Sequence, residues 1–300
     1  MNSNDITSTY QLISNYKDNE LFRNSYNELT RNTYGFDFEA WYQYGYWSDK
    51  HIPYSLLDNT HNFKMIANAS INILEFHTPL GDKTYLQIGT VMTDSNYRKK
   101  GLSRYLLEHI LREWEHKTDG IFLFANDSVL DFYPKFGFKK CLEYQYSKDI
   151  IATPTYTAQK KDMTNRENQT LLFDSILNSK TMSKFAMLNN PQLIMFYVTS
   201  FMKNNVYYIK ELNAYAIIEK TKHTLILHDV FVDTILPLDI IINALADKDA
   251  NKVVLNFTPM DTDGYRKSIL TEEDTTLYVL GKDFDFIEKE QLMFPSLSHT

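Results

Sequence analysis

The chain has 300 residues, of which 43% are hydrophobic and 23% charged, proportions typical of a folded globular protein and not of a disordered one. Its net charge of −7 argues against nonspecific nucleic-acid binding and favours a cationic partner such as an amine. The single cysteine, Cys141, excludes an internal disulfide, and the longest apolar run, residues 193–198, is far shorter than the roughly 20 residues that span a bilayer. Because residues 1–10 lack a signal-peptide pattern, we expect a cytoplasmic protein that binds neither membrane nor nucleic acid.

The N-terminal part is predicted to form a strand, a helix and an antiparallel pair of strands. Residues 10–16 have strand character, and Asn19 is a favoured cap for the helix that follows. A long alternating strand over residues 63–76 turns at residues 81–83 into a second strand that begins near Tyr85. This order predicts a strand meander.

An aromatic segment, residues 41–47, lies between these elements and is flanked by Asp37, Glu39 and Asp49. Ring faces attract cations and carboxylates pair with them, so the segment suits the recognition of an amine. The alternative is that most of these rings are core packing, because large aromatic side chains are usually buried. We expect one or two of the rings to face an acceptor.

The second strand leads into the basic run 98–103, RKKGLS, where a helix with one apolar stripe begins. The first amides of a helix have no partner within it, and the peptide dipoles make this end slightly positive, so such a loop can bind an anion. Gly101 lets the backbone approach closely, and Arg98, Lys99 and Lys100 add positive charge. The run is a candidate diphosphate site; the alternative is a solvated turn, because short glycine motifs are common.

A second motif follows this helix. An apolar strand over residues 121–125 ends at Asn126, and the segment 132–138 reads FYPKFGF. Together, and in this order, the two motifs resemble the GCN5-related N-acetyltransferases (GNATs), whose signature is an Arg/Gln-x-x-Gly-x-Gly/Ala loop, a strand and a Phe-Tyr-x-x-x-Gly-Phe segment. The resemblance covers roughly residues 10–163, with Ser103 in place of the usual Gly or Ala.

The resemblance implies an α/β fold with a mixed sheet, the GNAT acyl-CoA N-acyltransferase fold, and acetyl-CoA as co-substrate without a metal. The coenzyme would lie between the splayed ends of two central strands, with its diphosphate on the basic loop. Asn126 is alternatively a helix cap. The residues expected to contact the coenzyme are Val91, Met92, Thr93, Arg98, Lys99, Lys100, Gly101, Leu102, Ser103 and Asn126.

Tyr133 matches the family tyrosine that protonates the departing thiolate, a general-acid role for its hydroxyl. The reaction implied is direct attack of a neutral amine on the thioester, so Cys141 is expected to be core packing rather than a nucleophile. No base is identified from the sequence. The candidates are Glu75, Gln87 through a water, Glu39 and the chain end, for which a frayed tail is the favoured alternative.

Residues 164–300 are predicted to form a second, smaller α/β domain after a GNAT domain over residues 1–163. Strands at 142–148 and 156–163 are expected to close the first domain, and Thr164 to cap the next helix. The later order echoes the first domain: helices, strands, a helix over 237–246 and a strand over 252–257, so this half is a candidate degenerate GNAT-like copy. Its connection at 233–236 has no glycine or basic residue, so a second coenzyme site is not expected.

The favoured function is therefore an acetyl-CoA-dependent N-acetyltransferase acting on a small-molecule or peptide amine. The alternatives are an acyl-CoA-binding regulatory or interaction module without turnover, and a protein whose second domain provides an interaction or homodimer surface.

Overall fold

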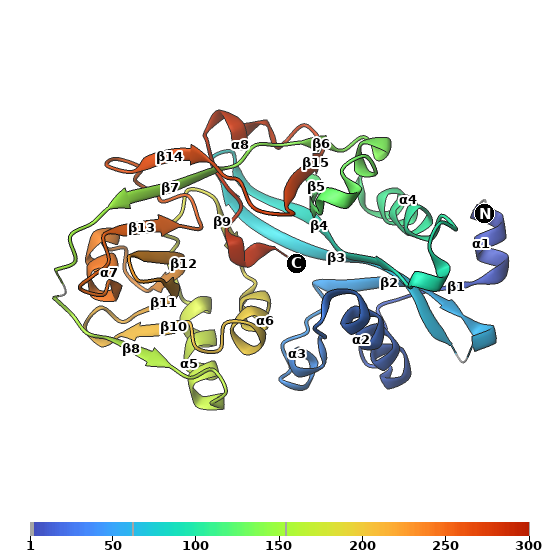
Figure 1. The fold of residues 1–300 in the computed structure, drawn as a ribbon, viewed down its shortest axis with the longest axis horizontal. Coiled ribbons are helices and arrows are strands. Elements are labelled where there is room, and N and C mark those ends of the chain that lie inside the picture. The colour runs from blue at the N-terminus through green and yellow to red at the C-terminus, as the bar shows by residue number, and fades with distance from the viewer. Residues whose placement is uncertain (1–2, 62, 154, 300) are drawn as a thin grey trace.

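The computed structural model describes residues 3–61, 63–153 and 155–299, whose strands form two mixed sheets (Figure 1). The first sheet has the strand order β1-β2-β3-β4-β5-β15-β6, and the short strand β9 also pairs with β3. Its strands are β1 (Gln11–Ser14), β2 (His51–Asp58), β3 (Lys64–Thr78), β4 (Gly81–Thr93), β5 (Gly120–Ala125), β6 (Lys139–Lys140), β9 (Ala186–Leu188) and β15 (Thr276–Leu280).

The second sheet has the order β14-β7-β13-β12-β11-β10-β8. Its strands are β7 (Tyr144–Asp149), β8 (Ala158–Lys161), β10 (Val206–Ile209), β11 (Ala214–Lys220), β12 (Thr224–Val232), β13 (Lys252–Leu255) and β14 (Arg266–Ile269). The α-helices of the chain are α1 (Ser3–Thr9), α2 (Glu20–Tyr34), α3 (Glu39–Gln43), α4 (Leu102–Trp114), α5 (Arg166–Leu177), α6 (Pro191–Ser200), α7 (Leu238–Leu245) and α8 (Asp285–Lys289).

The two halves of the chain exchange strands. After β6 the chain leaves the first sheet, and β7 pairs with β13 and β14 of the second sheet. Near the other end, β15 returns from the second half and pairs with β5 and β6 of the first sheet. A division at residue 163 therefore does not coincide with the division into sheets.

Each face of the first sheet is covered by apolar side chains from different elements. On one face, Leu106 and Ile110 of α4 are fully buried in a cluster with Ile71. On the other face, Tyr26 of α2 lies in a cluster with Phe294, from the segment after α8. Burying a large apolar side chain stabilises a fold by about 1.5–3 kcal/mol, so this C-terminal segment is a structural part of the first sheet's core.

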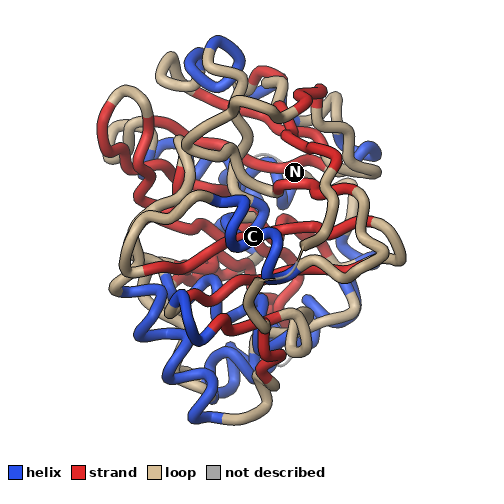
Figure 2. The backbone as a smooth tube through the Cα atoms, turned by 90° about the vertical axis from the view of Figure 1, so that its left-hand side faces the viewer, coloured by secondary structure: helices blue, strands red, loops and turns tan. Residues whose placement is uncertain are grey.

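The C-terminal segment, residues 292–299, runs between the two sheets, and both Figure 1 and Figure 2 place the end of the chain in the middle of the molecule. The backbone amide of Phe294 donates to Glu143 at 2.8 Å, and the amide of Met293 donates to Thr258 at 3.0 Å. Leu292, Met293 and Phe294 are at most 1% exposed. The expectation of a frayed tail is therefore wrong for these residues.

Most predicted elements are confirmed, and three differences have simple causes. The strands predicted at 142–148 and 156–163 form, as β7 and β8, but they belong to the second sheet, because strand pairing partners are not encoded in local periodicity. The cap of α5 is Asn165, whose side chain accepts from two amides, and not Thr164. The predictions also lacked β2, whose pattern is interrupted by Pro53.

Among the described residues, no helix is both long and apolar enough to cross a bilayer.

Candidate active site

An opening between the two central strands of the first sheet forms the site. Strands β4 and β5 are parallel and pair only where residues 85–87 face residues 120–122. Beyond these pairs the strands diverge, because β4 carries an extra residue against β3: Ser70 pairs with Gly89, while Asn68 pairs with Met92. Thr90, in this bulge, has φ 44°, a left-handed conformation that redirects the strand.

A cavity of about 750 Å³ lies in the opening. One end is walled by the basic loop and the start of α4, and the other by the end of α2 and the segment after it. The residues that line it are Thr33, Tyr34, Phe36, Ile88, Gly89, Thr90, Val91, Met92, Thr93, Tyr97, Arg98, Lys99, Gly101, Leu102, Ser103, Arg104, Phe124, Asn126, Ser128, Val129, Phe132 and Tyr133. All the predicted site residues except Lys100 are among them.

The basic loop presents free amides to this cavity. Lys99 and Gly101 have φ values of 63° and 83°, so the chain turns twice through the left-handed region before α4 begins. Among the described residues, none accepts a hydrogen bond from the amides of residues 101–104. With the guanidinium groups of Arg98 and Arg104 on the same wall, this end can bind an anion of more than one negative charge.

Two residues of the loop have structural contacts that the sequence did not predict. The Lys100 ammonium lies 4.5 Å from the centre of the Tyr97 ring and donates to the Tyr10 hydroxyl at 3.4 Å, so its side chain is directed away from the cavity. The Ser103 hydroxyl lies 2.8 Å from the Thr93 hydroxyl, which ties the first turn of α4 to the end of β4. Serine at this position therefore has a partner in the protein.

The edge of β4 is partly occupied by side chains. The Tyr34 hydroxyl donates to the Val91 carbonyl at 3.0 Å, and the Asn68 amide donates to the Thr90 carbonyl at 3.0 Å. A carbonyl oxygen has two lone pairs, so each can still accept from a ligand. Tyr34 thus reaches over the bulge from the end of α2.

Asn126 is held from the second half of the chain. Its side-chain amide donates to the Asp274 carboxylate at 3.0 Å, and the same carboxylate accepts from the Asp127 amide at 2.7 Å. Asn126 makes no cap hydrogen bond of its own, so the capping alternative does not describe it. With its nitrogen engaged by Asp274, the side-chain oxygen of Asn126 is oriented as an acceptor at the cavity wall.

Tyr133 lies at the first position of a short 3-10 helix, Tyr133–Phe136, where Pro134 is tolerated because its missing amide needs no partner. The ring is 5% exposed and packs between Phe132 and Phe138. Burial, with a smaller contribution from Tyr34, raises the pKa of Tyr133 well above its ordinary value. The phenol is therefore protonated at neutral pH, as it would also be without this shift.

The side chains considered as bases do not line this cavity. Glu75 bonds Lys50 at 3.1 Å and Asn189 at 2.8 Å, and Glu39 lies in an ion-pair network. Gln87 is a fully buried residue of β4. The terminal carboxylate belongs to Thr300 and lies outside the described residues.

Burial raises the pKa of Cys141 to about 12, so its thiol is protonated. The cysteine belongs to the apolar cluster around Tyr26, as predicted from its strand context.

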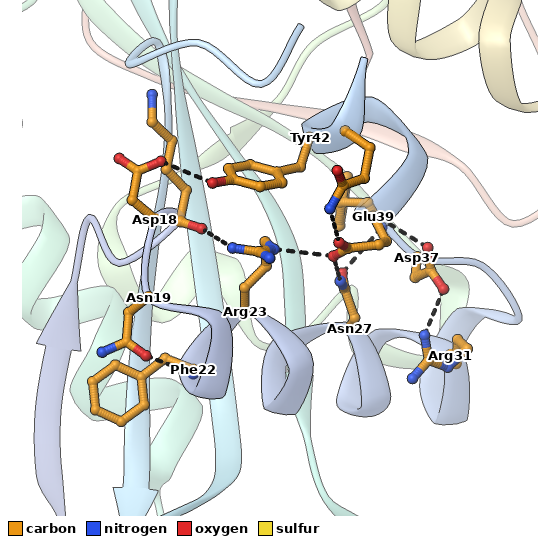
Figure 3. A network of polar contacts seen from close by, with 12 residues as sticks. Asp18, Asn19, Phe22, Arg23, Asn27, Arg31, Asp37, Glu39 and Tyr42 are labelled. Atoms are coloured by element: carbon orange, nitrogen blue, oxygen red, sulfur yellow. Dashed lines mark hydrogen bonds and ion pairs between the residues drawn. The ribbon is translucent and has the colours of Figure 1, made fainter. Parts of the chain in front are cut away.

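The carboxylates that flank the aromatic segment are paired with basic side chains (Figure 3). Arg23 donates to Glu39 at 3.0 Å, and Arg31 donates to Asp37 at 2.5 Å. Burial raises the pKa of Glu39, but hydrogen bonds from Gln43 and Arg23 outweigh this and lower it overall. These carboxylates therefore stabilise the α2–α3 region rather than point toward the cavity.

The last described residues approach the opposite side of the opening. The His299 ring stacks on Phe124 with a centre separation of 3.7 Å, and the Tyr197 hydroxyl donates to the His299 carbonyl. Phe294 stacks on Phe122 at 4.1 Å. Burial lowers the pKa of His299 to about 3, so its imidazole is neutral.

Sequence reasoning did not identify Tyr34, Phe36, Arg104 and Asp274. Arg104 follows the motif directly, so its proximity to the loop was a usable signal. The other three come from distant segments, and only the pairing of β15 with β5 brings Asp274 to the cavity.

Comparison with known proteins agrees with this geometry. Residues 65–140, which include β4, α4, β5 and Tyr133, match the family model of the acetyltransferase (GNAT) domain. No curated protein sequence matches the chain.

Three solved structures with similar folds are a probable N-acyltransferase from Enterococcus faecalis V583, a GCN5-related N-acetyltransferase from Kribbella flavida and Eis1 from Mycobacterium abscessus. The first is 13% identical with a TM-score of 0.59, over 90% of this chain and 72% of that one. The second is 11% identical with a TM-score of 0.55, over 91% and 71%. The third is 12% identical with a TM-score of 0.54, over 89% and 72%. The chain thus has the fold of GNAT N-acetyltransferases, and residues 65–140 contain its acetyltransferase (GNAT) domain signature.

Proposed function

We propose that this protein is an N-acetyltransferase that transfers an acetyl group from acetyl-CoA to the primary amine of a small molecule or peptide. The observation that supports it best is the combination, in one cavity, of two features. Free amides and guanidinium groups lie at one end of the cavity, and a protonated phenol lies farther along the opening between β4 and β5.

The cavity residues fit acetyl-CoA, which supplies an activated acetyl thioester and carries a diphosphate. The amides of residues 101–104, with Arg98 and Arg104, would hold the diphosphate. The exposed edge of β4 at the Thr90 bulge would pair with the extended amide arm, and the Asn126 oxygen would accept from it.

Tyr133 then has a defined chemical task. When a neutral amine attacks the thioester carbonyl, a carbon–nitrogen bond forms, the carbon–sulfur bond breaks and the sulfur leaves with the electron pair. The Tyr133 phenol donates its proton to that sulfur, and the amine proton passes to solvent or a base. The phenol holds this proton at neutral pH, as a tyrosine of ordinary pKa also does.

The test is acetyl-CoA turnover, measured as free thiol with a panel of primary amines. Tyr133→Phe should lower kcat by about 100-fold, the scale of general-acid catalysis, while the Kd for CoA in calorimetry changes little. The matched control is Tyr278→Phe, a buried tyrosine whose ring centre lies 6.1 Å from that of Tyr133 and whose hydroxyl bonds the Leu130 carbonyl. That variant should retain kcat within a few-fold.

Two results would contradict the proposal. The absence of saturable CoA binding would exclude the coenzyme site. Tight CoA binding without thiol release from any amine, unchanged in Tyr133→Phe, would instead identify a non-catalytic acyl-CoA-binding module.

A further inference from the structure

We propose that the acceptor is a small molecule with one primary amino group on an aromatic body, and not a polyamine. This inference rests on the proposed function. The proposal follows from the side chains that line the cavity around Tyr133 and the end of α2, here called the acceptor end. They come from the end of α2, the segment after it and the region around Tyr133.

Among the described residues, the acceptor end is lined by aromatic rings and Thr33, without a charged side chain. Its described lining residues are Thr33, Tyr34, Phe36, Phe124, Phe132 and Tyr133. Across the whole described lining, the charged side chains are Arg98, Lys99 and Arg104, all at the basic loop. The described part of this wall therefore offers no carboxylate to a ligand with several ammonium groups.

Three rings form an aromatic rim, defined as Tyr34, Phe36 and Phe201; Tyr34 and the half-buried Phe36 line the cavity, and Phe201 lies beside Phe36. Phe36 lies 6.1 Å from Tyr34 in a stacked arrangement and 5.3 Å from Phe201 in an edge-to-face arrangement, measured between ring centres. Tyr34 is 41% exposed and Phe201 is 54% exposed. Large apolar side chains that remain exposed together at a cavity mark a binding surface.

The rim is built by both halves of the chain. Tyr34 and Phe36 follow α2, whereas Phe201 follows α6, and Phe196 of α6 also packs against Phe36 at 6.0 Å. The second half therefore shapes the acceptor entrance as well as supplying β15.

The carboxylates that could have attracted a polycation here are already neutralised. Asp37 pairs with Arg31, Glu39 with Arg23, and Asp49 with Lys17 (Figure 3 shows the first two pairs). The sequence-based expectation that the rings of residues 41–47 and their flanking carboxylates act together on an amine is therefore not met: none of these rings lines the cavity, Trp41 and Trp47 are buried in the core, and the carboxylates face basic side chains.

These features favour one kind of substrate. The attacking amine must be neutral, and aromatic rings pack on aromatic rings with edge-to-face or offset geometry. An aromatic body on the rim would bring a single amino group toward Tyr133, while a polyamine would lose hydration without gaining ion pairs.

The experiment compares kcat/KM for 2-phenylethylamine, n-hexylamine and spermidine at saturating acetyl-CoA, by thiol release. We expect 2-phenylethylamine to exceed n-hexylamine by about 10-fold and spermidine by more. Phe201→Ala should lower kcat/KM for 2-phenylethylamine about 10-fold, with a smaller effect on n-hexylamine and no change in the KM for acetyl-CoA. The control is Leu80→Ala, a 62% exposed side chain at the turn between β3 and β4.

The outcomes separate this inference from the proposed function. Turnover that is fastest with spermidine, or unaffected by Phe201→Ala, would overturn the aromatic acceptor and leave the acetyltransferase intact. No turnover with any of the three amines, despite CoA binding, would overturn both. The predicted order with the predicted loss in Phe201→Ala would support both.

Discussion

The two sheets have the same design but differ at the opening between their central strands. The first sheet is followed from β1 and the second from β8. In each, three antiparallel strand pairs come first, then one parallel pair and then two more antiparallel pairs. In each sheet the sixth strand comes from the other half of the chain: β15 in the first and β7 in the second. The halves therefore fold as one interlocked unit.

Each sheet has a bulge in the strand before its opening, β4 in the first sheet and β12 in the second, and the two bulges have different surroundings. In the first sheet the bulge at Thr90 faces the cavity. In the second, Ile217 pairs with Asp229 and Ile218 with Leu227, which leaves His228 as the extra residue on β12.

His228 and the residue after β13 hold the C-terminal segment. The His228 ring lies 3.0 Å from the Ser296 hydroxyl, and the Ser296 amide donates to the Asn256 carbonyl at 3.0 Å. The C-terminal segment thus occupies part of the second opening, where the cavity lined by residues 229–231, Phe257 and Pro295 has only about 160 Å³, against about 750 Å³ in the first.

The loops that lead from the strand before each opening into the next helix also differ. The first loop joins β4 to α4, and the second joins β12 to α7. The first loop has Gly101 in the left-handed region, free amides and a helix without acidic residues in its first turn. The second loop ends at Pro237, where α7 begins. Asp239 lies in the first turn of α7 and pairs with Lys148. The two sheets therefore share a strand order but not a site. Under the proposed function, a coenzyme site also needs an open space between the central strands and a loop that can bind an anion.

Truncation after residue 163 should have the largest effect, because it tests whether the first sheet folds without the second half of the chain. It removes β15 and Phe294, so the edge of β5 and the core around Phe122 become exposed. We expect the fragment 1–163 to be insoluble or to lack a cooperative thermal transition by circular dichroism, because the lost pairing and burial exceed a typical total stability of about 5–15 kcal/mol. A soluble fragment that unfolds cooperatively and binds CoA would show that the first sheet is independent.

Matched glycine substitutions compare the two halves directly. Gly101 and Gly264 have φ values of 83° and 78°, and Gly264 lies in an exposed loop of the second half. Valine in this conformation costs on the order of 1–2 kcal/mol at either site. Gly101→Val should also raise the Kd for CoA at least ~10-fold by displacing the free amides, whereas Gly264→Val should not. Equal Kd values in calorimetry would contradict the anion-binding role of the loop.

The pH dependence of stability tests how the C-terminal segment is held. Burial raises the pKa of Glu143 to about 8, with a smaller contribution from Glu272, despite the hydrogen bond from the Phe294 amide. Because the folded pKa is above the unfolded one, this group's contribution to the free energy of unfolding is complete below about pH 4.5 and is lost as pH rises through 8.

Glu143→Gln keeps an oxygen acceptor for Phe294 and removes the titration. Urea unfolding should give a variant more stable than the wild type at pH 8.5, by on the order of 1–3 kcal/mol, and similar to it at about pH 4, where the carboxyl is protonated in both states. The exposed Glu290→Gln is the control. An unchanged pH profile in Glu143→Gln would show that another group governs it.

The elements that carry the motif were predictable because their signals are local. The α4 stripe, the glycine in the basic loop and the Asn19 cap all depend on residues within one or two turns. The match of the 132–138 segment placed Tyr133 at the cavity without any long-range information.

The exchange of β7 and β15 was not predictable, because pairing partners more than 100 residues apart leave no mark on periodicity. For the same reason the roles of Asp274 and Phe201 appeared only in three dimensions. The ion pairs of Asp37 and Glu39 likewise depend on helix α2 lying beside α3.

We propose that the first opening binds the coenzyme, while the C-terminal segment occupies the second. Calorimetric titration of the full chain with CoA tests it most directly. We predict one binding site per chain, lost or weakened at least ~10-fold in Gly101→Val. Two sites per chain, or binding that is unaffected by this substitution, would contradict the account.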